Sequence, residues 1–365
     1  MNPLIIVFII DGMSRGGAEK VVLTLACAMS KQGHDVSIIS LRSEQAYLIP
    51  EGIRLLLVED RYHGPFHRLT EVRRRARQLD SVLSQHFSDR KIDLAISNLP
   101  MTDRIVAASG RLQDAWMCLH GTVAATQLSR RAGILRFLKK CQLQHTYNGR
   151  KLITVSSGLQ LDIKEVGGVR PERMITIHNP YDLDEIRKLS RHECPMEGER
   201  FLLHVGRFNP VKRHDRLFEA FRLSKYPGKL VLLGGGNAKQ EQEMHRLCLQ
   251  MGVGNRVIFA GFTPNPYPYM RAAEALLLSS DSEGLPNVLI ETLACGTPVV
   301  STNCPYGPQE ILIEDLARGL SELSAESLAH CLNDILSNPP VISPRLLDRF
   351  SVQNITNQYL ALAGY

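Results

Sequence analysis

The sequence lacks the signatures of several common protein classes. Its eight cysteines form no CxxC pair, so neither the usual zinc-ligand spacing nor a disulfide framework is present. The longest apolar run near the start, residues 4–10, is far shorter than the roughly 20 residues of a membrane-spanning helix. No basic segment or small-residue cleavage site flanks this run. We therefore expect a cytoplasmic protein with reduced cysteines, in which residues 4–10 form a buried strand.

Two further signatures are absent. No GxGxxG pattern follows the first strand of either half, which argues against an oxidoreductase with a dinucleotide cofactor. The arginine run at 73–77 has no interleaved aromatic residue, the basic segment 130–140 has only Phe137, and the chain has a single tryptophan, which argues against a nucleic-acid partner. A non-catalytic basic binding protein remains an alternative at this point.

The composition is that of an ordinary globular protein, with 44% hydrophobic and 22% charged residues in a chain of 365. That length is enough for two cores of roughly 150 to 200 residues each. The formal net charge of +6 is unevenly distributed, because residues 1–178 contain 25 Lys and Arg against 16 Asp and Glu, a net of +9. The remainder has a net charge of −3, so a large acidic partner is expected to meet the first half.

Short apolar runs alternate with longer stretches of helical periodicity, which is typical of βαβ units and a parallel sheet. In the first half we predict strands near 4–10, 35–41, 53–58, 92–97, 115–119 and 151–155, and helices at 17–32, 68–87, 101–110, 130–147 and 157–166. A second series of strands is predicted at 201–205, 229–233, 256–259, 275–278 and 298–300. The fold predicted from these patterns is α/β, with two doubly wound parallel-sheet domains: residues 1–178, a linker at 179–200, residues 201–345, and a C-terminal helix at 346–365.

The segment 130–140 mixes cations with Ile, Leu and Phe at helical spacing. A helix of this composition suits an anionic membrane surface. A solvated basic face is an equally good interpretation of this segment and of the arginine run at 73–77.

The strongest local signal is residues 281–300, DSEGLPNVLIETLACGTPVV, which predict a loop, a helix, a glycine stop and a strand. Glu283 stands in the loop, and Glu291 lies eight residues later inside the helix. A nucleotide sugar needs two such contacts, one to sugar hydroxyls and one to the ribose diol, with the diphosphate between them. We expect the diphosphate on the free amides of Gly284 and Leu285 at the helix start. In the structural alternative, Glu283 caps the helix and Glu291 faces solvent.

The second signal is GRFNPVKRH, residues 206–214, at the carboxyl end of the second half's first strand. Ligands of open α/β sheets bind outside the carboxyl ends of the strands. Arg207 can hold two phosphate oxygens and Lys212 adds a point charge, so the pair indicates a phosphate-bearing ligand. An exposed cationic helix start is the structural alternative, although cations there oppose the helix dipole.

Two weaker signals lie in the first half. Gly16-Gly17 forms a turn after the first strand and lets the backbone approach a phosphate or sugar. His120 follows the strand at 115–119 on the ligand side and can hydrogen-bond a transferred sugar. Each also has a purely structural interpretation, as a glycine turn and as a structural histidine.

The triplet Asp182-Leu183-Asp184 matches the DxD spelling of metal-dependent transferases. It lies in the predicted linker with no flanking strand, so we interpret the match as chance. We therefore predict no catalytic metal and no cofactor.

The combined motifs resemble those of glycosyltransferase family 4, whose members have the GT-B fold. These motifs are GGAE, HG, GRFNPVK, and EGLPNVLIE followed by ACGTPVV. The order and spacing of these motifs match over nearly the whole chain. The resemblance implies two Rossmann-like domains facing a cleft, a nucleotide-sugar donor on the C-terminal domain, a saccharide acceptor on the N-terminal domain, and a C-terminal helix crossing back. It also implies retention of anomeric configuration, with the departing phosphate helping to deprotonate the acceptor.

The resemblance also assigns roles by position. Glu283 would contact the donor sugar, Glu291 the ribose, and Arg207 and Lys212 the leaving diphosphate, with the base near Phe262. The catalytic residues implied are His120, Arg207, Lys212 and Glu283. The donor-binding residues implied are Gly16, Gly17, Arg207, Lys212, Phe262, Glu283, Gly284, Leu285, Pro286, Asn287 and Glu291.

Pro286 stands where many relatives have glycine, which removes one donor amide. The EGLPN form resembles the bacterial branch that builds lipid-linked oligosaccharides, capsule, O-antigen and lipopolysaccharide core, mostly from UDP-sugars. We therefore expect transfer of a hexose or N-acetylhexosamine from a UDP-sugar to a lipid-linked glycan or lipopolysaccharide intermediate. The enzyme is expected at the inner face of the plasma membrane, with the segment 130–140 on anionic lipid. A nucleotide-sugar epimerase of GT-B fold is the main alternative.

Overall fold

The computed structural model describes residues 2–13, 16–43, 48–60, 64, 67–88, 90–122, 127–128 and 132–364. The chain divides into two compact units. Unit 1 contains Met1–Pro180 and Val352–Tyr365, and unit 2 contains Tyr181–Ser351. Each unit has its own sheet and its own hydrophobic core, so each is described separately.

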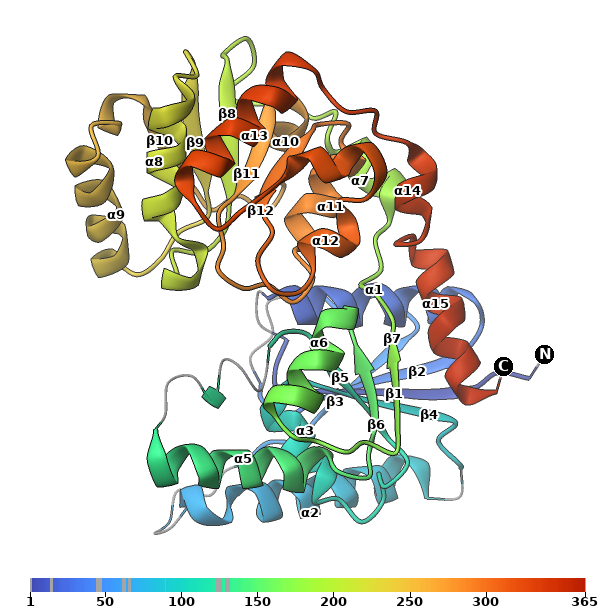
Figure 1. Ribbon diagram of the computed structural model, residues 1–365. Helices are drawn as coiled ribbons and strands as arrows, with labels where there is room; N and C mark the ends of the chain where they lie inside the picture. Colours follow the sequence, from blue (N-terminus) through green and yellow to red (C-terminus); the bar gives the residue numbers. More distant parts are fainter. Residues whose placement is uncertain are drawn as a thin grey trace. The chain divides into compact units, whose positions relative to one another are not determined.

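Unit 1 is built on a seven-stranded sheet in the order β3-β2-β1-β4-β5-β6-β7 (Figure 1). All neighbouring strands are parallel. Every residue of β1 is buried, as expected for a strand covered on both faces. The strands are β1 (Ile5–Ile10), β2 (Asp35–Ser40), β3 (Ile53–Leu57), β4 (Leu94–Asn98), β5 (Trp116–Leu119), β6 (Lys151–Thr154) and β7 (Arg173–Thr176).

Helices cover both faces of this sheet (Figure 1). One face packs on α2, α3 and α5 through a core that includes Val7, Leu83, Ile105 and Tyr147. The C-terminal helix α15 packs against α1 in the same unit, and Tyr359 on α15 lies 3.5 Å from Cys118 on β5. The helices are α1 (Gly17–Lys31), α2 (His67–Phe87), α3 (Pro100–Ala107), α5 (Gly133–Tyr147), α6 (Ser157–Leu161), the π-helix Asp162–Val166 and α15 (Val352–Leu360).

Unit 2 contains a six-stranded sheet in the order β10-β9-β8-β11-β12-β13, again with parallel neighbours. Its core includes Leu202, Phe218, Leu232 and Leu332. The strands are β8 (Phe201–Val205), β9 (Lys229–Leu233), β10 (Val257–Gly261), β11 (Ala275–Leu278), β12 (Val299–Thr302) and β13 (Leu320–Ser321). The helices are α7 (Leu183–Leu189), α8 (His214–Ser224), α9 (Ala238–Gln250), α10 (Tyr267–Ala272), α11 (Asn287–Ala294), α12 (Pro308–Ile311), α13 (Ala325–Ser337) and α14 (Pro344–Asp348).

The structure differs from the sequence-based expectations at the ends of both units. The stretch 179–200, expected as a linker, contains α7, because Asp182 caps the helix (Oδ1 to Glu185 N–H, 3.0 Å) and Leu183 and Ile186 are buried. The single helix expected at 346–365 is two helices, α14 in unit 2 and α15 in unit 1. They are separated at Ser351, which pairs with Tyr181. The edge strands β7 and β13 were not predicted.

No helix in the described part of the chain combines the length and hydrophobicity needed to cross a bilayer. All eight cysteines are unpaired in the structure.

Candidate functional site

The candidate site of unit 2 lies where its strand order reverses. β8 has β9 on one side and β11 on the other, and open α/β sheets bind ligands outside the carboxyl ends of the strands at such a reversal. The loops after β8 and β11 are residues 206–213 and 279–286, which contain both of the strongest sequence motifs. The topology therefore brings the two motifs together at the position where open α/β sheets bind ligands.

An ion pair between Lys212 and Glu283 joins the two loops. Lys212 Nζ donates to Glu283 Oε1 at 2.7 Å, and Ser280 Oγ donates to the same oxygen at 2.5 Å. Both side chains are mostly buried, with 19% and 13% exposed. Among the described residues both contacts use Oε1, so Oε2 is the oxygen left for a ligand. Lys212 has three N–H donors and uses one on Glu283, so it can also donate to an anion.

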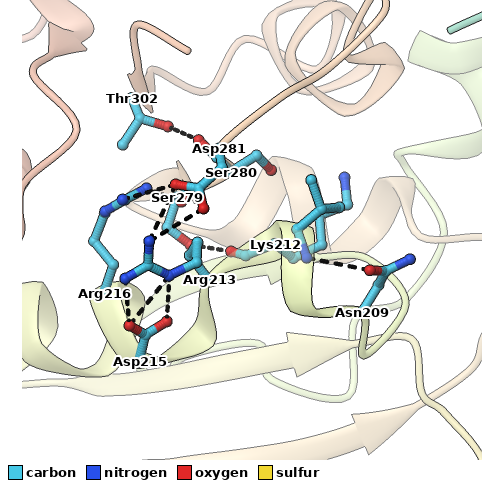
Figure 2. Close-up of polar contacts among 10 residues, drawn as sticks. Asn209, Lys212, Arg213, Asp215, Arg216, Ser279, Ser280, Asp281 and Thr302 are labelled. Carbon is cyan, nitrogen blue, oxygen red and sulfur yellow. Dashed lines mark hydrogen bonds and ion pairs between the residues drawn. The ribbon is translucent and has the colours of Figure 1, made fainter. Parts of the chain in front are cut away.

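Asp281 fixes the same two loops from the other side (Figure 2). Arg213 Nη1 lies 3.1 Å from Asp281 Oδ2, and Arg216 Nη2 donates to Asp281 Oδ1 at 2.8 Å. Arg213 also holds Asp215 through Nε and Nη2, which lowers the pKa of that carboxyl. The backbone carbonyl of Lys212 accepts from Ser279 Oγ at 2.7 Å. Lys212 and Glu283 are thus each held next to a two-arginine clamp on Asp281.

Arg213 has a left-handed backbone conformation, with φ 49° and ψ 57°. A residue with a side chain costs roughly 1–2 kcal/mol in this region. The ion pairs to Asp215 and Asp281 offset that cost and place Lys212 one residue before the kink.

We predict that Asp281→Asn lowers kcat by about tenfold, since a misplacement of the order of 1 Å is costly at a reacting centre. The amide removes the negative charge between the two arginines, so the 212–213 segment loses one of its anchors to the 279–283 loop. Donor-cleavage kinetics and the affinity for UDP are the measurements. Asp334→Asn, in an exposed pair with Arg318, is the matched control. Equal losses of kcat in the two variants would remove the positioning role of Asp281.

Helix α11 begins at Asn287, with Pro286 as its N-cap. Gly284 and Leu285 therefore precede the helix instead of forming its start, and Pro286, which has no N–H, occupies the cap. That the amides of Gly284 and Leu285 hold the diphosphate stays a prediction. The amides of the first helical turn belong to Asn287 and Val288. The hydroxyl of Tyr181 donates to Asn287 Oδ1 at 2.7 Å.

Glu291 lies one turn inside α11 and is buried, with 7% exposed, so the expectation of a solvent-facing carboxylate does not apply. The hydroxyl of Tyr267, on α10, donates to Glu291 Oε1 at 3.3 Å. A carboxylate is an acceptor that can take hydrogen bonds from a diol.

Two glycines allow close backbone contacts around these loops. A Cβ on Gly234, which has φ +121°, would lie 2.0 Å from the Gly206 carbonyl oxygen. A Cβ on Gly307, with φ +94°, would lie 2.6 Å from the Gly284 carbonyl oxygen. Only glycine fits at either position, so the end of β9 and the loop before α12 pack directly on the site loops.

Arg207 and Phe262 lie at the same carboxyl edge of the sheet. Arg207 is exposed in the loop after β8. Phe262 follows β10 and is 64% exposed, which is unusual for a large apolar side chain. Both side chains are accessible to a ligand.

His120, in unit 1, pairs with Asn98 at the ends of the neighbouring strands β5 and β4. Its Nε2 lies 2.9 Å from Asn98 Oδ1. The Asn98 amide donates to the carbonyls of Ile9 and Ile96, so its oxygen must accept from His120. Nε2 therefore carries the proton and Nδ1 is the acceptor. Burial lowers the pKa of His120 to about 4, which makes this imidazole neutral at pH 7.

Gly16 is the N-cap of α1 and Gly17 is its first residue. A Cβ on Gly16 would lie 2.2 Å from Glu19 Oε2, because the Glu19 carboxylate folds back over the helix start. Gly16 thus makes room for this carboxylate, and a phosphate at the same turn would meet its negative charge. The preceding Ser14 and Arg15 lie outside the described residues.

Two buried histidines lie beneath the unit 2 loops, His204 on β8 and His214 at the start of α8. Their ring centroids are 5.0 Å apart, and each Nε2 is buried without a hydrogen-bond partner among the described residues. Burial, with a smaller contribution from the Lys212 charge, lowers the pKa of His214 to about 4. Burial also holds the pKa of His204 well below its usual value.

These histidines predict acid sensitivity. Their folded pKa values lie below the unfolded value of about 6.5, so the unfolded state binds more protons below that pH. The contribution of the two neutral histidines to the free energy of unfolding is fully present above pH 6.5. It is lost as the pH falls toward about 4, by up to about 1.4 kcal/mol per histidine per pH unit. The urea midpoint of wild type should fall between about pH 7 and pH 5, and His214→Gln should reduce that slope. His245→Gln, on the exposed face of α9, is the control; an equal change of slope in both variants would contradict the assignment.

Asp182 and Asp184 serve α7 in this structure. Asp182 caps the helix and Asp184 forms an exposed pair with Arg187. Within the described residues no group of three or more metal-ligating side chains is found.

Three functional contributors were missed from the sequence, namely the Asp281 clamp, Tyr267 and Tyr181. Asp281 was noticed only as the first residue of a motif. Asp281 lies two residues before Glu283, and Arg213 directly follows Lys212. An acidic and a basic residue beside the two predicted site residues could have indicated a second ion pair between the loops. Nothing in the sequence pairs Tyr267 with Glu291 or Tyr181 with Asn287, which are separated by 24 and 106 residues.

Two family models match adjacent parts of the chain. The model described as Glycosyltransferase Family 4 matches residues 15–185, and the model described as Glycosyl transferases group 1 matches residues 186–352. Together they cover most of both units.

Individual relatives agree with these matches. The chain is 26% identical to the N-acetylgalactosamine-N,N'-diacetylbacillosaminyl-diphospho-undecaprenol 4-alpha-N-acetylgalactosaminyltransferase of Campylobacter jejuni, over 87% of this chain and 86% of that protein. It is 33% identical to the lipopolysaccharide core biosynthesis glycosyltransferase LpsE of Rhizobium meliloti, over 44% of this chain and 48% of that protein. Among solved structures, Anabaena HepE in complex with UDP and glucose has a TM-score of 0.78 at 19% identity and 98% coverage of both chains. This likeness confirms the predicted fold of two Rossmann-like, GT-B-type domains.

Proposed function

Because the chain belongs to glycosyltransferase family 4, we propose that it transfers a hexose or N-acetylhexosamine from a UDP-sugar to a saccharide acceptor with retention of configuration. The observation that carries the proposal is the Lys212–Glu283 pair at the strand-order reversal of unit 2. It places a cation and a carboxylate side by side, as the leaving diphosphate and the sugar of one donor require.

The contacts of unit 2 suggest how the donor is held. Glu291 accepts from the ribose hydroxyls, with Tyr267 fixing one of its oxygens. The amides of Asn287 and Val288 and the positive end of α11 face the diphosphate. Glu283 Oε2 accepts from a sugar hydroxyl, and the exposed ring of Phe262 lies near the base.

In the proposed reaction, the bond between the sugar C1 and the phosphate oxygen breaks as the acceptor oxygen bonds to C1 on the same face. The acceptor proton passes to the departing phosphate oxygen, and UDP leaves. Lys212 and Arg207 stabilise the charge that develops on the diphosphate. Asp281 is held by two arginines, and Glu283 is assigned to a sugar hydroxyl, so the proposed reaction uses no carboxylate of this loop as a nucleophile.

Donor hydrolysis tests the reaction without an acceptor. A panel of UDP-α-sugars is incubated with the protein and followed by proton NMR. Release of UDP with the α-anomer of the free sugar appearing first supports the proposal. The β-anomer appearing first would show inversion, and interconversion of the donor sugar without UDP release would show an epimerase.

We further propose a lipid-linked glycan or lipopolysaccharide intermediate as acceptor, at the inner face of the plasma membrane. The names of the Campylobacter and Rhizobium relatives support this class of acceptor. The net charge of +9 in residues 1–178 also suits an anionic membrane.

Helix α5 supports membrane binding most directly. Four apolar side chains on its first two turns are exposed: Ile134 (73%), Leu135 (62%), Phe137 (64%) and Leu138 (56%). Arg136, Lys139 and Lys140 lie among them, which is the composition of an interfacial helix. Arg130 and Arg131, also part of the predicted segment, lie outside the described residues.

A further inference from the structure

Unit 1 contains a pocket between α3 and α5 that the proposed reaction does not use. Its volume is about 310 Å³. It begins close to the carboxyl edge of the sheet, because α3 starts two residues after Asn98, the partner of His120. The lining residues are Pro100, Met101, Arg104, Gln127, Lys139, Gln142, Leu143, Thr146 and Tyr147.

The side chains that line the pocket favour an anion. Arg104 on α3 and Lys139 on α5 contribute two positive charges from two different helices, and no carboxylate is among the lining residues that the structure describes. The neighbouring Asp103 points inward instead, where it accepts from Ser97 Oγ at 2.6 Å and from Tyr147 OH at 2.8 Å. Burial raises the pKa of Asp103 to about 7, so this carboxyl compensates the two cations only in part.

The pocket adjoins the exposed apolar end of α5. Lys139 lines the pocket, and Leu138 immediately before it is 56% exposed. Lys139 Nζ donates to Gln142 Oε1 at 2.6 Å, and both side chains line the pocket. An anion-binding pocket next to four exposed apolar side chains suits a ligand that has both a phosphate and a hydrocarbon part.

We propose that the α3/α5 pocket binds the phosphodiester headgroup of an anionic glycerophospholipid while the first turns of α5 enter the lipid layer. This inference rests on the proposed membrane association and names the lipid that it recognises. Arg104 can hold two phosphate oxygens and Lys139 a third, a geometry that phosphate satisfies better than a carboxylate. The occupant is a membrane lipid rather than free phosphate, because only a lipid covers the apolar turns of α5.

The test compares two vesicle types with a phosphate-free matrix of digalactosyldiacylglycerol. One contains about 30 mol% phosphatidylglycerol and the other the same share of cholesteryl hemisuccinate, which gives a similar surface charge without phosphate. We expect wild type to bind the first at least about fivefold more tightly in flotation assays. Arg104→Gln with Lys139→Gln should abolish that preference. Arg136→Gln with Lys140→Gln removes the same charge outside the pocket, and should weaken binding to both vesicles equally while keeping the preference.

The outcomes separate this inference from the proposed function. Failure of wild type to bind either vesicle would refute the membrane association, and with it the inference. Binding without preference for phosphatidylglycerol, or equal effects of the two double variants, would refute the pocket alone. Release of wild type by millimolar inorganic phosphate would show a free-anion site and overturn the lipid assignment. Circular dichroism melting of each variant establishes that a loss of preference does not reflect unfolding.

Discussion

Replacement of Lys212 by alanine is expected to lower kcat for donor cleavage by about 100-fold or more. Lys212 is held by Glu283 at its ammonium and by Ser279 at its backbone carbonyl, so its charge is fixed before the donor arrives. A charge held in place stabilises the developing negative charge of the leaving diphosphate without reorganisation. The measurement is the rate of UDP release from a saturating UDP-sugar.

The substitution also leaves Glu283 without its cation, and a second lysine variant controls for loss of charge alone. Lys239→Ala removes an exposed lysine on α9 in the same unit and should leave kcat within about twofold of wild type. If Lys212→Ala behaved like Lys239→Ala, the assignment of Lys212 to the leaving group would be wrong.

Glu283→Gln is expected to lower kcat/KM by about 50-fold while the affinity for UDP changes by less than about threefold. The amide keeps the size of the side chain but loses the charge that Lys212 and Ser280 hold in place. Its proposed partner is the sugar, which UDP lacks, so nucleotide binding should be spared. Steady-state kinetics and calorimetric titration of UDP measure the two quantities separately.

The matched control is Glu243→Gln on the exposed face of α9. A loss of UDP affinity in Glu283→Gln as large as its loss of kcat/KM would place Glu283 at the nucleotide instead of the sugar. It would also shift the proposed sugar contact to another residue of the loop.

Most strands were predictable, because a parallel strand buried on both faces appears in the sequence as a continuous apolar run. β1 and β11 are of this kind, and all their residues are buried. The edge strand β7 was missed because none of its residues is fully buried: Arg173 is exposed and the other three are half-buried. Such a strand does not appear in the sequence as a continuous apolar run. β13 has two residues, too few for any periodic pattern.

The site was predictable to the level of residue types and sheet edge. Local patterns placed Lys212 and Glu283 after two strands, and the parallel topology brought them together. The start of α11 was misplaced because Pro286 acts as the cap, so the first-turn amides are those of Asn287 and Val288. The clamp of Arg213 and Arg216 on Asp281 joins side chains 68 and 65 residues apart, and such pairings depend on the folded chain.

The most direct test of the donor site is titration of UDP against wild type, Arg207→Ala and Glu291→Ala, followed by thermal unfolding. UDP at about 100 times its dissociation constant should stabilise wild type by roughly 2.7 kcal/mol. At that concentration the two variants should gain little, because each lacks a group that we assign to the nucleotide. Equal stabilisation of all three proteins, or no response of wild type to UDP, would contradict the placement of a UDP-sugar at the carboxyl edge of the unit 2 sheet.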